Sequence, residues 1–344
     1  MSKIKEVAIA CGVSIATVSN VMNGKGRVSE DSRNRILQVA KEMNYVPNWM
    51  AKNLKQHKSR VIGIITEDLT VFNCVDIIDG INEYLEQKQY SFVLGNLRLF
   101  KKYNNEFYHH EDYFGQVQEE FRIMESTQVA GIIYVCAHCR EINFIPKLDQ
   151  VPIVLTYGFS KEENIPSFIY DDEQAAFDAT VEMIINGHMK IGLITGERFS
   201  LHTTARLKGY QRALYENGLL YNPDFVYDGD WSRSKGYEAA KDLIDKGVSA
   251  IFAMNDEMAA GVYDYVYEVG LEIGKDVALV GFDNREICTA FRPALTTVSI
   301  PLNEIGRNAA KKMIDILEKD TTKEAPIHHV KCKLVKRKSV NKRI

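Results

Sequence analysis

The chain of 344 residues has no long hydrophobic run and no recognisable export signal. Its longest apolar run, Val129 to Ala137, has 9 residues, whereas a membrane-spanning helix needs about 20. The N-terminal apolar stretch is interrupted by Glu6 and is followed by no cleavage site, so it does not match a signal peptide. We therefore expect a cytoplasmic protein that has no membrane partner and whose 6 cysteines are free thiols.

Motifs of the common enzyme classes are also missing. The sequence has no G-x-S-x-G nucleophile elbow, no H-E-x-x-H zinc motif, no Walker A loop and no G-x-G-x-x-G after a strand. Cys136-Ala-His-Cys139 could supply part of a zinc site, but such a site needs four ligands, and only His109 and His110 are nearby candidates. A cysteine at a strand end is more often a small buried hydrophobe. The sequence thus predicts no enzyme, no metal site and no cofactor.

Charge is distributed unevenly along a chain of otherwise ordinary globular composition, with 45% hydrophobic and 26% charged residues. Residues 1–60 carry 11 basic and 4 acidic side chains, and residues 331–344 carry 7 basic and none acidic. The part between them carries 25 basic and 42 acidic side chains. A small basic unit on a large acidic body suggests that one end binds a polyanion, although a solvated basic face would give the same counts.

Three short amphipathic helices are predicted in the first 46 residues. The first has an apolar stripe over residues 4–11, and the second spans residues 15–23 with Ser14 as its N-cap. The third follows Ser29 and ends at Asn44. Two short helices joined by a glycine-containing turn are typical of a helix-turn-helix.

The second helix has one side suited to packing and an opposite side suited to DNA. At 100° per residue, Val18, Val21 and Met22 cluster on one side, whereas Ala16 and Asn20 point away from them. Alanine can pack on a thymine methyl group, and asparagine can bond N6 and N7 of adenine. The pattern predicts a helix that reads the major groove, with a three-helix interaction module as the alternative.

The first 55 residues resemble the DNA-binding end of the LacI/GalR (lactose-repressor) family, through VA–GVS–ATVS–V–NG, VS–R–I and Y–PN–A–L. The resemblance implies a sequence-specific transcriptional regulator, in the first instance a repressor, that binds a pseudo-palindromic operator at the nucleoid as a homodimer. Pro47–Leu54 matches the family's hinge helix, which inserts an apolar wedge into the minor groove. Asn20 stands where the family commonly has arginine, which favours adenine over guanine at that contact. The resemblance assigns base contacts to Ile15, Ala16, Asn20 and Leu54, and phosphate contacts to Ser14, Thr17, Asn23, Arg33 and Tyr45.

From Val61 onward, buried β-branched runs alternate with helical stretches, which predicts parallel doubly wound sheets in two α/β lobes. The stretches KIGLITG, AIFAMNDEMAAGVY, DVALVGFDN and PALTTVSIP resemble the periplasmic-binding-protein-like core of the same family. The resemblance implies an all-α helix-turn-helix domain at 1–46, a hinge helix and linker at 47–60, and an effector-binding and dimerisation core at 61–344. It places lobe one at about 61–159 and 289–321, and lobe two at about 160–288 and 322–344.

Ligands of open α/β sheets bind beyond the carboxyl ends of the strands. Arg206, Trp231, Asn255 and Asp283 match the family's effector-contacting positions, and Asn73 closes the stretch that follows the first strand of the core. An aromatic face suits sugar CH groups, and the polar side chains can bond vicinal hydroxyls, which favours a saccharide effector over a purine. Asn255 and Asp283 could instead cap loops or helix starts. A regulator that answers to a protein partner, and a sugar-binding protein without a regulatory role, are the remaining alternatives.

Residues 100–114 form an aromatic, histidine-bearing stretch in a region about ten residues longer than is usual in the family. A pocket rim or an extra dimer contact is possible, but a surface loop is the simpler expectation.

Overall fold

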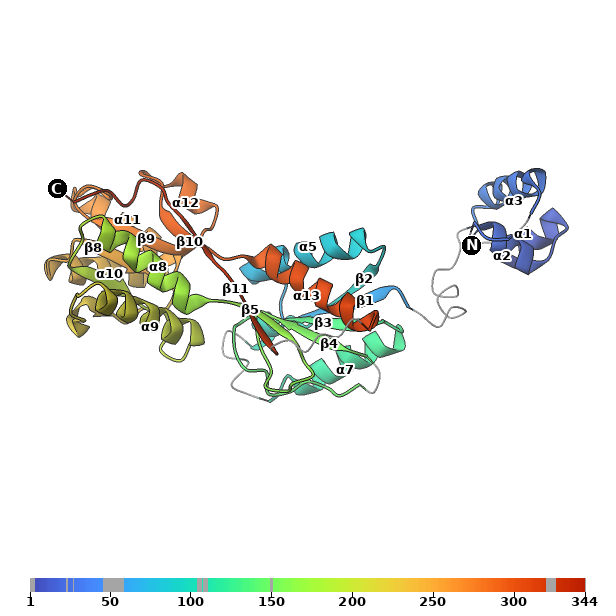
Figure 1. Ribbon diagram of the computed structural model, residues 1–344, viewed down its shortest axis with the longest axis horizontal. Coiled ribbons are helices and arrows are strands. Elements are labelled where there is room, and N and C mark those ends of the chain that lie inside the picture. The colour runs from blue at the N-terminus through green and yellow to red at the C-terminus, as the bar shows by residue number, and fades with distance from the viewer. Residues whose placement is uncertain are drawn as a thin grey trace. The chain divides into compact units, whose positions relative to one another are not determined.

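The computed structural model describes residues 4–22, 24–26, 28–45, 59–103, 107, 111–148, 151–319 and 326–343. The chain divides into two compact units, Met1–Arg60 and Val61–Ile344 (Figure 1).

The N-terminal unit contains the helices α1 (Ile4–Cys11), α2 (Ile15–Met22) and α3 (Glu30–Glu42). The backbone N–H of Thr17 donates to Ser14 Oγ at 3.0 Å, so Ser14 caps α2 as predicted. No single helix in the described ranges is long and apolar enough to cross a membrane, although α1 and α2, bent by 105° at their junction, pass that test as a pair. The three helices enclose one small core, made of Val7, Ala8, Cys11, Val18, Val21, Ile36 and Ala40.

The second unit is built from two six-stranded sheets, each flanked by helices (Figure 1). The first sheet is parallel throughout and has the strand order β11-β5-β4-β3-β1-β2. Its strands are β1 (Val61–Thr66), β2 (Ser91–Asn96), β3 (Gly131–Val135), β4 (Ile153–Thr156), β5 (Ser167–Tyr170) and β11 (Ile327–Val330). The helices of this lobe are α5 (Phe72–Gln87), α6 (Leu99–Tyr103), α7 (Phe114–Ser126) and α13 (Leu302–Leu317).

The second sheet has the order β12-β10-β9-β8-β6-β7 and is parallel except for β12, which runs antiparallel to β10. Its strands are β6 (Ile191–Ile194), β7 (Val226–Tyr227), β8 (Ala250–Ala253), β9 (Ala278–Asp283), β10 (Thr296–Ser299) and β12 (Lys333–Val335). Its helices are α8 (Asp172–Ile185), α9 (Leu201–Glu216), α10 (Arg233–Asp245), α11 (Asp256–Glu268) and the short α12 (Ile287–Ala290). An N-terminal helical unit followed by a two-lobed α/β body with mainly parallel sheets is therefore the architecture that the sequence predicted.

The points where the chain crosses between the lobes differ from those predicted. β5 and β11 belong to the first sheet, whereas the predicted bounds placed residues 160–288 and 322–344 in lobe two. β10 belongs to the second sheet, whereas residues 289–321 were expected in lobe one. Each of these strands has only 4 residues, too short for a periodic pattern. The sheet that each one joins is decided by long-range pairing, with β5 and β10 pairing to β4 and β9.

Candidate functional site

The outer face of α2 is exposed and carries no charged group. Ile15, Ala16 and Asn20 are exposed, whereas Val18 and Val21 are buried in the helical core. This division follows the helical period, because the buried side must pack on α1 and α3. The face therefore offers small, apolar and amide groups of the kind that contact base edges in a major groove.

Polar residues flank this face. Ser14 and Thr17 lie at the N-terminus of α2, with their side-chain oxygens 2.8 Å apart, where free backbone N–H groups favour an anion. Arg33 and Tyr45 are half-buried on and after α3, and burial raises the pKa of Tyr45 above its usual value. Asn23 and residues 46–58, which include Leu54 and most of the predicted hinge and linker at 47–60, lie outside the described residues.

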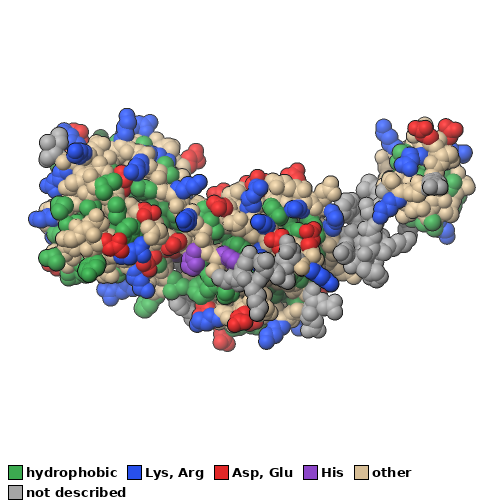
Figure 2. Space-filling view, in the orientation of Figure 1, with side chains coloured by type: hydrophobic (Ala, Val, Ile, Leu, Met, Phe, Trp, Pro, Cys, Tyr) green, Lys and Arg blue, Asp and Glu red, His purple; other side chains and the backbone are tan. Residues whose placement is uncertain are grey.

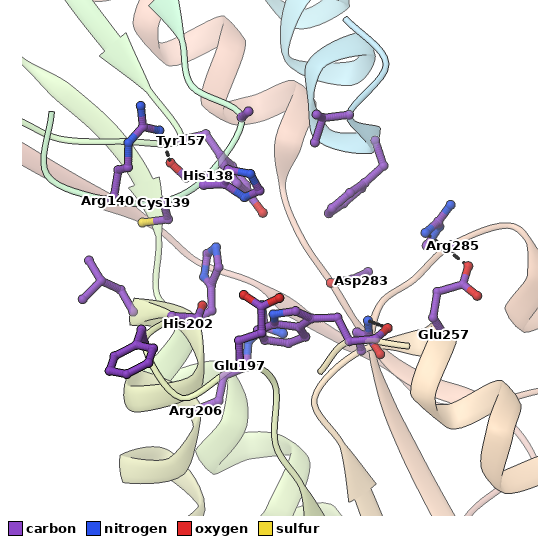
Figure 3. A pocket seen from close by; sticks show the side chains of 18 residues that line it. His138, Cys139, Arg140, Tyr157, Glu197, His202, Arg206, Glu257, Asp283 and Arg285 are labelled. Carbon is purple, nitrogen blue, oxygen red and sulfur yellow. Dashed lines mark hydrogen bonds and ion pairs between the residues drawn. The ribbon is translucent and has the colours of Figure 1, made fainter. Parts of the chain in front are cut away.

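A cleft of about 330 Å³ lies between the two lobes of the second unit (Figure 3). The space-filling view shows histidine side chains in the hollow between the lobes (Figure 2). Four of the five predicted effector residues line the cleft, namely Arg206, Trp231, Asn255 and Asp283. The rest of the lining comprises Val71, Phe72, Ala137, His138, Cys139, Arg140 and Tyr157 from lobe one, and Glu197, Phe199, Ser200, Leu201, His202, Glu257 and Arg285 from lobe two.

Arg206 is a fixed cation at the wall of the cleft. Its Nε donates to Asp172 Oδ1 at 2.6 Å, its Nη2 donates to the Tyr170 hydroxyl at 2.9 Å, and its Nη1 donates to the Met254 carbonyl. Its guanidinium carbon lies 3.5 Å from the ring centroid of Phe282. Burial alone would raise the pKa of Asp172, but the neighbouring imidazole and guanidinium outweigh burial and lower it. The carboxylate therefore stays ionised and holds the arginine in place.

Asn255 holds the loop that presents Trp231. Its Oδ1 accepts from the backbone N–H of Met258 at 2.8 Å, which caps α11, and its Nδ2 donates to the Trp231 carbonyl at 2.9 Å. The alternative that Asn255 caps a helix thus holds, while its side chain also lines the cleft. Trp231 has a φ of 72°, in the left-handed region that costs about 1–3 kcal/mol for a residue other than glycine. Such strain is typical of residues that a site holds in position.

Asp283 ends β9 with its carboxylate directed into the cleft (Figure 3). Its φ of 110° is also positive. Burial raises the pKa of Asp283 well above its usual value, and the nearby Asp256 adds to this effect while Arg206 opposes it. Among the described residues no side chain forms an ion pair with Asp283. This carboxyl group is therefore available to a ligand.

The lobe-one wall contains a buried ion pair that sequence reasoning missed. Arg140 binds Glu67 through two bonds, from Nη2 to Oε1 at 2.6 Å and from Nη1 to Oε2 at 3.0 Å. Glu67 is fully buried and also accepts from the Ala137 backbone N–H at 2.7 Å. A signal was present, because Glu67 follows β1 and Arg140 follows its neighbour β3, so both come from the same edge of the sheet.

Of the two cysteines near this wall, Cys136 is buried and Cys139 is half-buried. Burial raises the pKa of Cys136 well above its usual value and raises the pKa of Cys139 to about 12. Over the described ranges no group of three or more His, Cys, Asp and Glu side chains could hold a metal ion.

Comparison with known proteins shows which family has this architecture. The family model for bacterial regulatory proteins of the lacI family matches residues 3–48, and the model for a periplasmic binding protein-like domain matches residues 182–340. Catabolite control protein A of Priestia megaterium is 32% identical over 322 residues, which cover 92% of this chain and 93% of that protein. The chain belongs to the LacI family of bacterial regulatory proteins. It is a DNA-binding transcriptional regulator with a ligand-binding core.

Other members of the LacI family align over nearly the whole chain. The HTH-type transcriptional repressor PurR of Aliivibrio salmonicida is 29% identical over 348 residues, which cover 99% of this chain and all of that protein. The lac repressor dimer bound to operator and the anti-inducer ONPF has a TM-score of 0.78 at 23% identity and covers 99% of both chains. The complex of the transcriptional regulator CelR with cellobiose has a TM-score of 0.63 at 25% identity, covering 98% of this chain and all of that one.

Asn73 of this LacI-family chain does not line the cleft, contrary to the prediction. It is fully buried in the first turn of α5, where its Nδ2 donates to the Cys136 carbonyl at 3.0 Å. Its position after a strand end was a valid signal, but the turn of α5 directs the side chain toward the neighbouring loop. The bond ties α5 to the end of β3, so Asn73 supports the lobe-one wall from behind.

The long stretch at residues 100–114 contributes to the core of lobe one. Phe107 is fully buried and contacts Tyr113 edge to face, with the ring centroids 5.4 Å apart. The Arg140 guanidinium lies 5.1 Å from the Phe107 ring centroid, and the His138 ring lies 5.9 Å from it. The expectation of a simple surface loop is therefore wrong for Phe107, which lies behind two residues of the cleft wall.

Proposed function

We propose that this LacI-family protein is a cytoplasmic regulator that binds a pseudo-palindromic operator as a homodimer, and that a saccharide bound between its lobes controls its operator affinity. The observation that carries the proposal is the interlobe cleft, where a strained Trp231 faces the same space as Asp283, whose carboxyl group has no ion-pair partner among the described residues. An aromatic face and a hydrogen-bonding carboxyl group are the pair of features that sugar rings need.

Ligand control requires that the two lobes respond to one molecule. The cleft takes residues from both lobes, with Tyr157 on one side and His202 on the other, their ring centroids 5.6 Å apart. A ligand that contacts both walls favours one angle between the lobes. The size of this effect is limited by the difference in ligand affinity between conformations that differ in this angle. Linkage then requires that operator DNA changes the ligand affinity by the same factor.

The exposed face of α2 is proposed to read the operator. Ile15, Ala16 and Asn20 would contact base edges, with Leu54 as the minor-groove wedge by family resemblance. Phosphate contacts would position the protein without carrying sequence information, and they are assigned to Ser14, Thr17, Asn23, Arg33 and Tyr45. Six to ten such contacts in the dimer would give a log–log salt slope of about −5 to −9.

The test uses the full-length protein. Selection on random DNA identifies the operator, and its affinity is then measured with and without mono- and disaccharides. At least one saccharide is expected to raise the melting temperature and to change operator affinity, because a ligand at 100 times its dissociation constant stabilises by about 2.7 kcal/mol. Trp231→Ala should lose this response, whereas Tyr215→Ala, an aromatic residue 84% exposed on α9 outside the cleft, should keep it. A response to purine bases and to no saccharide would replace the sugar by a purine.

A further inference from the structure

The hydrogen-bonding groups of the cleft are divided unevenly between donors and acceptors. Each guanidinium in the lining contacts a carboxylate, but only the pairs of Arg140 and Arg206 are buried, whereas the side chains of Arg285 and Glu257 are 42% and 40% exposed. The pairs are Arg140 with Glu67 at 2.6 Å, Arg206 with Asp172 at 2.6 Å, and Arg285 with Glu257 at 3.3 Å. In the side chain of Asn255, Oδ1 caps α11 and Nδ2 binds the Trp231 carbonyl, so each polar atom already has one partner.

The side chains of Asp283 and His202 each keep a polar group free for a ligand. The carboxyl group of Asp283 forms no hydrogen bond or ion pair with any side chain in the described part of the chain. The Nε2 atom of His202 is buried and has no hydrogen-bond partner there. Both residues line the cleft, at different places on the lobe-two wall (Figure 3).

The neighbours of His202 decide what its free nitrogen can do. Its Nδ1 lies 2.7 Å from Asp172 Oδ2 and 3.1 Å from the Tyr170 hydroxyl. Because the Asp172 carboxylate is ionised and can only accept, Nδ1 must carry the proton. Nε2, the ring nitrogen left without a partner, accepts a hydrogen bond when the imidazole is neutral and donates one when it is protonated. Tyr170 also stacks on the imidazole, with an interplanar angle of 12° and a centroid distance of 5.3 Å, which fixes the ring plane.

The charges in and behind the cleft wall also disfavour an anionic ligand. Three guanidinium groups face five carboxyl groups, which are the three paired carboxylates together with Asp283 and Glu197. An anionic ligand that bound Arg140 or Arg206 would have to draw the arginine away from its carboxylate and leave a buried charge without a counterion. A ligand that donates hydrogen bonds meets no such cost.

We propose that His202 is a specificity-determining residue of the effector site, that its Nε2 forms a hydrogen bond with a hydroxyl group of the ligand, and that the cleft selects uncharged or cationic polyhydroxylated ligands over phosphorylated or carboxylated ones. The inference rests on the proposed function in one respect, namely that the effector binds in this cleft.

The charge selectivity is tested with matched saccharides on the full-length protein. Pentoses, hexoses and disaccharides are compared by calorimetry with their 2-amino, phosphate and uronate counterparts. A neutral or amino sugar is expected to bind at least tenfold more tightly than its anionic counterpart. If the anionic counterpart bound more tightly, the selectivity would be wrong while the saccharide site would stand. If no member of any class bound, both the saccharide effector and this inference would fall.

The role of His202 is tested with two substitutions and deoxy sugars. In His202→Asn the shorter amide keeps a donor near Asp172 but has no polar group at the position of Nε2, so affinity should fall about 5- to 100-fold. In His202→Gln the amide oxygen can reach that position, so affinity should stay within about threefold of the wild type. Lys208→Asn is the control, because Lys208 is exposed on the same helix and does not line the cleft.

Monodeoxy analogues of the best saccharide separate direct contact from a structural effect. One deoxy position should weaken binding to the wild type and have little further effect in His202→Asn, since the hydroxyl and the imidazole form one bond. If every deoxy analogue weakened binding equally in both proteins, or if His202→Asn bound like the wild type, His202 would not contact the ligand.

Discussion

The indole ring of Trp231 occupies space that only glycine at position 196 leaves open. A Cβ atom at Gly196 would overlap the ring atoms of Trp231. The ring is further fixed by the bond from Asn255 to the Trp231 carbonyl and by the Arg206 guanidinium, 5.7 Å from the ring centroid. The stacking face is therefore positioned before any ligand arrives, which reduces the entropy lost on binding.

Gly196→Ala should displace this face. We expect saccharide affinity to fall at least tenfold, because the added methyl group and the indole cannot occupy the same space. Gly115→Ala is the matched control, since Gly115 is exposed in α7 and has no atom within 4 Å of an added Cβ. Calorimetry on both variants measures the effect, and equal affinities would show that the face of Trp231 does not contribute to binding.

Glu67 balances the charge of Arg140 inside lobe one. Glu67→Gln leaves the guanidinium buried without a counterion, so the free energy of unfolding should fall by about 3–5 kcal/mol. Glu272→Gln removes an exposed partner of Lys275 and should cost at most about 1 kcal/mol. Urea unfolding of the two variants provides the comparison. A loss of less than 1 kcal/mol in Glu67→Gln would mean that water reaches the buried pair.

His138 should make the stability of the core depend on pH. Burial lowers its pKa to about 4, against about 6.5 in the unfolded chain. The unfolded state therefore binds a proton first as the pH falls, and stability decreases between about pH 6.5 and 4 by an amount on the order of 3 kcal/mol. Asp172 acts in a different window, because its lowered pKa costs stability only below its unfolded value of about 3.9.

The measurement is the free energy of unfolding of the wild type and His138→Gln between pH 7 and 4.5. The wild type should lose more stability over this range than the variant, which lacks the titrating group. Parallel curves would show that His138 is hydrated enough to be protonated in the folded state.

The sequence predicts contacts that depend on local periodicity better than contacts that depend on which strands meet. The helices α1 to α3 and the cap at Ser14 follow from stripes and turn residues within a few positions. Arg206 and Asp283 were placed in the cleft from family resemblance, and the structure brings them together. The Glu67–Arg140 pair joins residues 73 positions apart, and no local pattern encodes such a pair. The direction of the Asn73 side chain depends on the first turn of α5, which its place in the sequence does not define.

Asn20 provides the test of the DNA-reading face. Its side chain is exposed on α2, on the side opposite the buried Val18 and Val21. Asparagine suits adenine and arginine suits guanine, so Asn20→Arg should move the preference at one symmetric base position toward guanine, by about 1–3 kcal/mol per contact. The other positions of the operator should keep their preferences, because they are read by other side chains.

An added positive charge alone would strengthen binding to any DNA, and the control must separate this effect from base readout. Asn34→Arg adds the same charge at an exposed position of α3, away from the reading face. It should steepen the salt dependence of DNA binding without changing base preference, because phosphate contacts carry no sequence information. Binding selection on random DNA is run with the wild type and both variants at one salt concentration. If Asn20→Arg keeps the wild-type preference, or if Asn34→Arg changes it equally, then Asn20 does not contact a base edge and another face of the helical unit reads the operator.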